Sequence, residues 1–152
     1  LLCSAYQKGD LALAHIRSLL NNHVTINSMY AEAGPVIETP LAGMECIQQL
    51  LLQSWGGKVR VFPAMPEEWQ DASFENLAAQ GGFVVSASYK NGRTEWIQIK
   101  SLTDTECTVE CDMTKAEVSF DGKNYTEVDI QKLYHLKINA GETVFVRNTL
   151  YL

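Results

Sequence analysis

A chain of 152 residues has room for one ordinary domain, or for a small domain together with part of another. Hydrophobic residues make up 46% of it and charged residues 20%, so a packed core is expected and extensive disorder is not. The formal net charge of −6 and the absence of a Lys/Arg cluster argue against nucleic-acid binding, and no apolar run approaches the roughly 20 residues of a membrane-spanning helix.

Residues 1–6 carry neither an initiator methionine nor the flanks of a signal peptide, so we expect the chain to be a piece of a longer protein that starts within a helix. Apolar residues at helical spacing then predict a helix over residues 10–20, with Asp10 as its N-cap. Residues 22–37 show no steady period and predict a long irregular loop. Loops of this length inside a compact domain are usually functional.

A second helix is predicted over residues 39–54. Thr39 suits the N-cap, and Pro40 suits the first helical position, where a backbone N–H is not needed. Trp55 and the glycines at 56 and 57 then predict the C-terminal end of the helix. The helix carries a broad apolar stripe of Leu41, Met44, Ile47, Leu50 and Leu51.

Beyond Gly57 the hydrophobic period changes from helical to alternating. The dipeptide Asn91-Gly92 predicts a two-residue hairpin turn, and two further turns are expected at 121–122 and 140–141. Many short strands without an intervening helix predict a small antiparallel sandwich, and hence an α+β chain. The predicted strands cover residues 58–62, 83–89, 94–100, 105–111, 116–120, 133–138 and 143–147.

The four cysteines form no recognisable framework. Cys107 and Cys111 share one predicted strand, where residues four apart lie roughly 13 Å from each other, too far for a disulfide. No second Cys/His pair stands at zinc spacing. We therefore interpret all four as small hydrophobic residues, and expect neither a metal nor a cofactor.

Glu38 is the most interesting polar residue, because it ends the long loop just before the second helix. The partial positive charge of a helix N-terminus keeps a carboxylate ionised, which suits a general base, although the same charge also simply favours the helix. Tyr30 and His23, in the loop, are candidates for lining a substrate site. Trp55 and Trp69 could each stack on a sugar, or anchor the junction by packing.

Four short motifs resemble the C-terminal stretch of glycoside hydrolase family 95, which contains α-L-fucosidases and related α-L-galactosidases. They lie within residues 35–83 and consist of Leu51-Leu52-Gln53-Ser54, Gly56-Gly57, Pro63-Ala64-Met65-Pro66 and Gly81-Gly82-Phe83. The resemblance implies that residues 1–56 are the last helices of a catalytic (α/α)6 barrel and that residues 57–152 are a C-terminal β-sandwich domain. It also implies a glycan substrate, export to the periplasm or outside the cell, and an inverting reaction with two carboxyl groups roughly 6.5–9.5 Å apart.

Glu38 falls where the resemblance places the catalytic Asp, in a segment that reads Asp-Gly-Asn in the family. Here the segment reads Glu38-Thr39-Pro40, so the acid is one methylene longer and the substrate can differ from fucose. The general acid would lie upstream of Leu1, and the fragment would be inactive alone. Its exposed helices would pack on the rest of the barrel, fold back on the sandwich, or pair in a homodimer.

A second interpretation, from a different class, is a non-catalytic sugar-binding or purely structural β-sandwich module. Such a module would use its sheet face or loops, with Trp69 or Trp96 as the stacking residue. The two interpretations differ in where an open, aromatic-lined hollow should lie: beside Glu38 in the first, on the sandwich in the second.

Overall fold

The computed structural model describes residues 1–27, 30–31, 37–130 and 133–151. The chain forms two compact units, one made of Leu1–Leu51 with Ala64–Glu67, and the other of Leu52–Pro63 with Glu68–Leu152. The first unit is helical and the second is built of strands, so the predicted α+β composition is confirmed. None of the described helices is long and apolar enough to cross a membrane.

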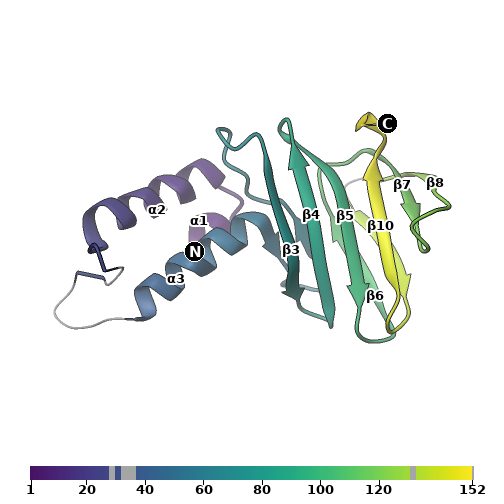
Figure 1. Cartoon of the computed structure of the whole chain (residues 1–152), viewed down its shortest axis with the longest axis horizontal. Helices are drawn as coiled ribbons and strands as arrows, with labels where there is room; N and C mark the ends of the chain where they lie inside the picture. The colour runs from purple at the N-terminus through teal and green to yellow at the C-terminus, as the bar shows by residue number, and fades with distance from the viewer. Residues whose placement is uncertain (28–29, 32–36, 131–132, 152) are drawn as a thin grey trace. The chain divides into compact units, whose positions relative to one another are not determined.

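The helical unit contains α1 (Leu2–Ala5), α2 (Gly9–His23) and α3 (Glu38–Leu51), labelled in Figure 1. The helix predicted over residues 10–20 is confirmed as α2, but Asp10 is not its N-cap. Lys8 holds that position, and Asp10 instead accepts a hydrogen bond of 2.9 Å from the backbone N–H of Glu67. The approach of α2 to residues 64–65 requires glycine, because a Cβ on Gly9 would stand 2.4 Å from the carbonyl oxygen of Ala64.

Two details of the second predicted helix are wrong. Helix α3 begins at Glu38, so Thr39 lies inside the helix and is not its N-cap. It also ends at Leu51, before the predicted end at 54, because Leu52 and Gln53 form strand β1 and pair with Val61 and Arg60 of β2. Gly56 and Gly57, with φ of 69° and 72°, belong to the turn between these strands and do not stop the helix.

Part of the apolar stripe of α3 is open to solvent in this chain. Leu41, Met44 and Ile47 are 50%, 60% and 39% exposed, whereas Leu50 at the end of the helix is fully buried. These three residues are spaced at helical intervals and lie on one side of α3. We call them the exposed stripe.

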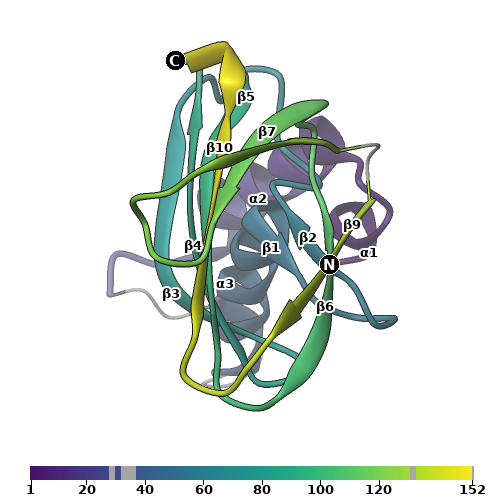
Figure 2. The same cartoon turned by 90° about the vertical axis from the view of Figure 1, so that its right-hand side faces the viewer.

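The second unit is a sandwich of two sheets, seen as separate layers in Figure 2. Most strand pairs are antiparallel, as predicted, but β2 pairs with β6 in parallel. The four-stranded sheet has the order β1 (Leu52–Gln53), β2 (Val59–Val61), β6 (Thr105–Glu110), β9 (Leu133–Ile138). The six-stranded sheet has the order β3 (Ala72–Ala79), β4 (Phe83–Lys90), β5 (Arg93–Ser101), β10 (Thr143–Asn148), β7 (Lys115–Ser119), β8 (Thr126–Asp129), and β10 leads into a 3-10 turn, Thr149–Tyr151.

The predicted hairpin at Asn91-Gly92 is confirmed between β4 and β5, with φ of 49° and 75° at the two positions. Strands β3 and β8 were not predicted. The alternation of β3 is broken by a bulge between Phe74 and Leu77, and β8 is a short polar edge strand with the sequence Thr-Glu-Val-Asp. A period-two pattern is the main sequence signal for a strand, and neither β3 nor β8 shows it clearly.

The core lies between the two sheets. Val85, Ile99 and Val144 are cross-strand partners on β4, β5 and β10, and each has no exposed surface. Phe62, just after β2, packs on Phe74 of the other sheet at a ring-centroid distance of 5.3 Å. Because side chains alternate along a strand, the intervening residues of β4, β5 and β10 lie on the opposite side of the six-stranded sheet, which we call the outer face.

Candidate functional site

Two of the predicted substrate-binding residues lie together in the helical unit. His23 is the last residue of α2, and Val24 forms an antiparallel bridge with Tyr30. The rings of His23 and Tyr30 have centroids 5.5 Å apart and are tilted by 39°. Residues 28–29 and 32–36 of the predicted loop lie outside the described residues.

Glu38 lies in the first turn of α3 and is exposed. The N-terminal end of a helix carries partial positive charge, so an acidic side chain in this turn stabilises the helix. Within the described part of the chain, no hydrogen bond or ion pair joins Glu38 to His23 or Tyr30. Its place in a site is therefore still a prediction.

Trp55, the third predicted substrate-binding residue, follows β1 in the sandwich unit and is 47% exposed. The guanidinium carbon of Arg60 lies 4.2 Å from the centroid of its ring, and the Nη1 of Arg60 donates a hydrogen bond of 2.8 Å to the Trp55 carbonyl. Arg60 is held in turn by Glu110, at 3.4 Å. One face of the indole is thus occupied by a cation–π contact, and a sugar would have to stack on the other.

The outer face of the six-stranded sheet carries a row of polar and aromatic side chains. Cross-strand pairing aligns Ser73 of β3 with Ser88 of β4, Ser88 with Trp96 of β5, Trp96 with Arg147 of β10, and Arg147 with Glu117 of β7. The register shifts between Ser88 and Tyr89, where Trp96 and Thr94 are the paired partners and Glu95 is the extra residue. A bulge of this kind re-aims side chains at a strand end.

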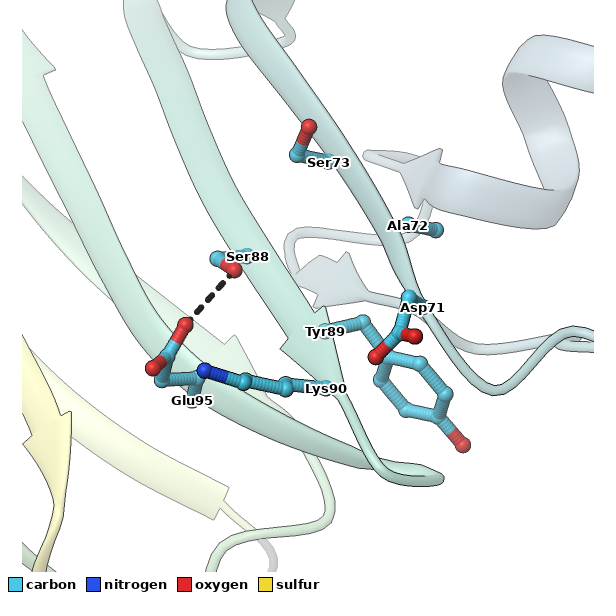
Figure 3. Close-up of a pocket in the computed structure, with 7 residues that line it drawn as sticks. All are labelled: Asp71, Ala72, Ser73, Ser88, Tyr89, Lys90 and Glu95. Atoms are coloured by element: carbon cyan, nitrogen blue, oxygen red, sulfur yellow. Dashed lines mark hydrogen bonds between the residues drawn. The ribbon is translucent and has the colours of Figure 1, made fainter. Parts of the chain in front are cut away.

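A hollow of about 460 Å³ occupies one end of this face, and Figure 3 shows the residues that line it. We call it the polar pocket, and it contains two carboxylates, Asp71 and Glu95, with Ser73, Ser88 and Lys90. The hydroxyl of Ser88 donates to Oε2 of Glu95 at 2.8 Å, drawn as the dashed line.

The rim of the polar pocket is fixed by the β4–β5 hairpin. Asp71 accepts a hydrogen bond of 3.1 Å from the N–H of Asn91. Tyr89 donates one of 2.7 Å to the carbonyl of Gly92. Burial raises the pKa of Tyr89, with a smaller contribution from the nearby Asp112 carboxylate, so its hydroxyl stays protonated and remains a donor at neutral pH.

A second hollow of about 320 Å³ lies on the same face, over β5 and β10. We call it the aromatic groove. Its lining includes three aromatic side chains, Trp96, Tyr125 and Phe145, together with the side chains of Gln98 and Arg147. This volume is at the lower end of the roughly 300–1,000 Å³ that is usual for small-molecule sites, and a mostly apolar wall with a few polar groups is their usual composition.

Arg147 is held rigidly at the edge of the aromatic groove. Its Nε and Nη2 atoms lie 2.7 Å and 2.6 Å from Oε2 of Glu117. Its guanidinium carbon also lies 3.8 Å from the centroid of the Tyr125 ring. The carboxylate neutralises the arginine, and the stacking fixes the tyrosine as a wall of the groove.

The turn that carries Tyr125 is built around Asp121. Its carboxylate accepts hydrogen bonds from the backbone N–H groups of Lys123 and Asn124, each at 2.8 Å, and from the side chains of Ser119 and Asn124. These bonds hold the pKa of Asp121 well below its usual value. The sequence predicted a turn at 121–122 but gave no sign that it delivers an aromatic residue to a groove.

The described residues offer no group of three or more His, Cys, Asp or Glu side chains arranged to hold a metal ion. All four cysteines are free. Burial raises the pKa of Cys107 to about 12 and that of Cys111 to about 11, so these two thiols are protonated and act as small core residues, as predicted.

Trp96 was predicted from the sequence as a possible stacking residue, but the side chains around it were not. The alternation of the predicted strand 94–100 would have placed Gln98 on the same face as Trp96, but Phe145 and Arg147 join them only through the register between β5 and β10. No local pattern could have found Tyr125, Asp71 or Glu95, because each depends on a turn, an unpredicted strand boundary or a bulge.

Comparison with known families gives one match. A sequence model described as the C-terminal domain of glycoside hydrolase family 95 matches residues 53–146. Comparison with curated protein sequences gave no significant match. The matched region begins at the end of β1 and includes most of the sandwich unit.

Proposed function

Because the chain belongs to glycoside hydrolase family 95, as a C-terminal region, we propose that its parent is an inverting, α-L-fucosidase-like glycoside hydrolase. The observation that carries this proposal is the match of the family's C-terminal domain over residues 53–146. In the parent, residues 57–152 would form the accessory sandwich domain. Residues 1–56 would complete the catalytic helical barrel, and the protein would be periplasmic or extracellular and act on an oligosaccharide or glycan.

The exposed stripe of α3 supports the origin of residues 1–56 in a larger helical domain. Leu41, Met44 and Ile47 are apolar, lie on one side of one helix and are between 39% and 60% exposed. Burying a side chain of this kind contributes roughly 1.5–3 kcal/mol, so a covering surface is strongly favoured. In the parent that surface would be the remaining barrel helices, and in the isolated chain a second copy could take its place.

Glu38 would serve as the general base of the reaction. In an inverting glycosidase this group takes a proton from the water that attacks the anomeric carbon, while a second carboxylic acid protonates the leaving oxygen. Glu38 is exposed in the first turn of α3, so its carboxylate is accessible to a water molecule, as a base that activates water requires. The second acid would come from another part of the parent, so the 152-residue chain by itself would be inactive.

The aromatic pair of His23 and Tyr30 would line the substrate side of the same site. Their rings are in contact, His23 as the last residue of α2 and Tyr30 in the segment that follows it. Trp55 would offer the face of its indole that Arg60 does not cover. His23 and Tyr30 would set affinity for the sugar and leave the chemical step to the two carboxyl groups.

The test is hydrolysis of chromogenic α-L-fucoside and α-L-galactoside by the full-length parent. Glu38→Gln removes the charge of the base and should lower kcat by a factor of 10² or more, because general-base catalysis contributes roughly 10²–10⁴-fold. Glu45→Gln is the matched control, since Glu45 is an exposed carboxylate on the same helix that accepts a hydrogen bond of 2.9 Å from Gln49.

Each outcome has a definite meaning. Activity lost in Glu38→Gln and kept in Glu45→Gln supports Glu38 as the base. Full activity of Glu38→Gln rejects that role, and a wild-type parent that hydrolyses neither substrate rejects the fucosidase-like specificity. Light scattering that finds the isolated chain monomeric would contradict pairing of two copies through their exposed helices.

A further inference from the structure

We propose that the outer face of the six-stranded sheet binds a neutral saccharide, with one pyranose ring in the aromatic groove and a neighbouring ring in the polar pocket. This site is separate from the catalytic role given to Glu38, because all of its residues belong to the sandwich unit. It would hold a glycan on the sandwich domain, whatever bond the parent hydrolyses.

The two hollows are neighbours on one continuous surface. Ser88 of the polar pocket and Trp96 of the aromatic groove are directly paired across β4 and β5. Glu95, whose carboxylate accepts a hydrogen bond from the Ser88 hydroxyl, directly precedes Trp96 in the chain. Paired residues in adjacent strands have Cα atoms only about 5 Å apart, so a ligand longer than one sugar ring would reach both hollows.

The aromatic groove has the composition that an uncharged sugar requires. Trp96, Tyr125 and Phe145 offer flat apolar surfaces to the C–H face of a pyranose. The amide of Gln98 also lines the groove, and no hydrogen bond among the described residues uses it, so both its donors and its acceptor are available to hydroxyl groups. A ring that stacks and hydrogen-bonds at once uses both kinds of surface.

Charge selects neutral over acidic saccharides. Arg147, the cation of the aromatic groove, is already neutralised by Glu117 at 2.6 Å. The polar pocket contains two carboxylates, Asp71 and Glu95, against the single ammonium group of Lys90. The lining of the two hollows therefore has no cation to spare for a uronic acid or a sulfated sugar, and the chain's net charge of −6 repels them further.

The aromatic groove is also formed in advance of binding. The Asp121 turn fixes the chain that leads to Tyr125, and the Tyr125 ring is stacked on Arg147. Side chains that are already ordered lose little entropy when a ligand binds, which favours the binding of a small sugar. Millimolar affinity for a single ring is the expected range.

The experiment uses the ¹⁵N-labelled 152-residue chain, titrated with methyl β-D-galactopyranoside and methyl α-L-fucopyranoside up to about 0.1 M, well above a millimolar dissociation constant. The readout is the indole N–H signal of Trp96, assigned with Trp96→Phe. We expect a saturable shift of this signal with at least one of the neutral glycosides. Methyl β-D-glucuronide should bind more weakly than the better neutral glycoside.

Two groove variants and one control complete the test, with binding measured on the amide signals. Trp96→Ala removes the stacking surface and should weaken binding about tenfold or more. Gln98→Ala removes only a surface amide, so it tests the site even if the first variant folds poorly. Tyr6→Ala is the control, because Tyr6 is an aromatic residue of the helical unit that is 75% exposed and lines neither hollow.

Three results would overturn the proposal. The first is a Trp96 signal that does not shift with either neutral glycoside, and the second is unchanged affinity in both Trp96→Ala and Gln98→Ala. The third is a shift that depends on protein concentration alone, which would assign the groove to a second copy of the chain. None of these results bears on hydrolysis by the parent, so this proposal and the catalytic one can fail separately.

Discussion

Replacing Ile99 by alanine should be among the most damaging single changes in the sandwich unit. Ile99 lies in β5, near the middle of the six-stranded sheet, and pairs with Val85 on one side and Val144 on the other. All three side chains have no exposed surface. The alanine variant loses three carbon atoms at the centre of this row.

The expected cost follows from the atoms removed. Transfer of three methyl or methylene groups from the core to water accounts for about 2.5 kcal/mol, and the cavity left between well-packed strands raises the total to about 3–4 kcal/mol. Ile99→Val removes a single methyl group and should cost about 1 kcal/mol. Lys100→Ala, at the adjacent exposed position of the same strand, should change the free energy of unfolding by less than about 0.5 kcal/mol.

Urea unfolding followed by far-UV circular dichroism and by tryptophan fluorescence measures these differences. The m-value should stay the same in all three variants. The midpoint of unfolding should be highest for Lys100→Ala, lower for Ile99→Val and lowest for Ile99→Ala. If Ile99→Ala lost less than about 1 kcal/mol, or no more than Ile99→Val, the row through β4, β5 and β10 would not be the centre of the core. The assignment of the outer face, which rests on the same alternation, would then also be wrong.

Three further predictions test other features. Gly9→Ala should lower Tm by several degrees, because the added Cβ would meet backbone carbonyl groups. Gly43→Ala, in the middle of α3 with a nearest contact of 3.4 Å, should raise Tm slightly. Equal effects of the two changes on Tm would refute the close approach at Gly9. The pKa of Asp121 is lowered in the folded state, so the stability that its carboxylate gives to the turn is present above the unfolded pKa near 4 and is lost as the pH falls through the folded pKa. The turn amides should therefore lose protection from hydrogen exchange in strongly acidic solution. In Asp121→Asn the same amides should be less protected already at neutral pH. A thiol reagent at pH 8 should label the native chain at only two of its four cysteines, because burial raises the pKa of Cys107 and Cys111, and fast labelling at either position would contradict their burial.

The proposed saccharide face and the proposed catalytic helix would serve the same parent in different ways. Glu38 would act on the bond that is broken, whereas the aromatic groove of Trp96, Tyr125 and Phe145 would keep the glycan near the enzyme. Loss of the groove should therefore raise KM for a polymeric glycan more than for a small chromogenic substrate. Loss of Glu38 should lower kcat for both.

The sequence by itself determined the main elements of this protein and its family. The helical stripe of α2, the alternation after Gly57 and the Asn91-Gly92 turn are local signals, since each depends on residues within one or two turns of the backbone. The motifs that resemble family 95 fall largely within the region that the family model matches. These properties survive in the sequence because neighbouring residues decide them.

The tertiary structure decided where helix α3 ends and what the sheet presents to solvent. Leu52 and Gln53 would continue a helix on local propensity, but pairing with Val61 and Arg60 makes them a strand. The outer face depends on partners far apart in the chain: Trp96 meets Arg147 across β5 and β10, and Tyr125 reaches them only through a turn fixed by Asp121. Which side chains share a surface is set by the register between strands, and register is fixed by long-range pairing and burial, which no local pattern contains.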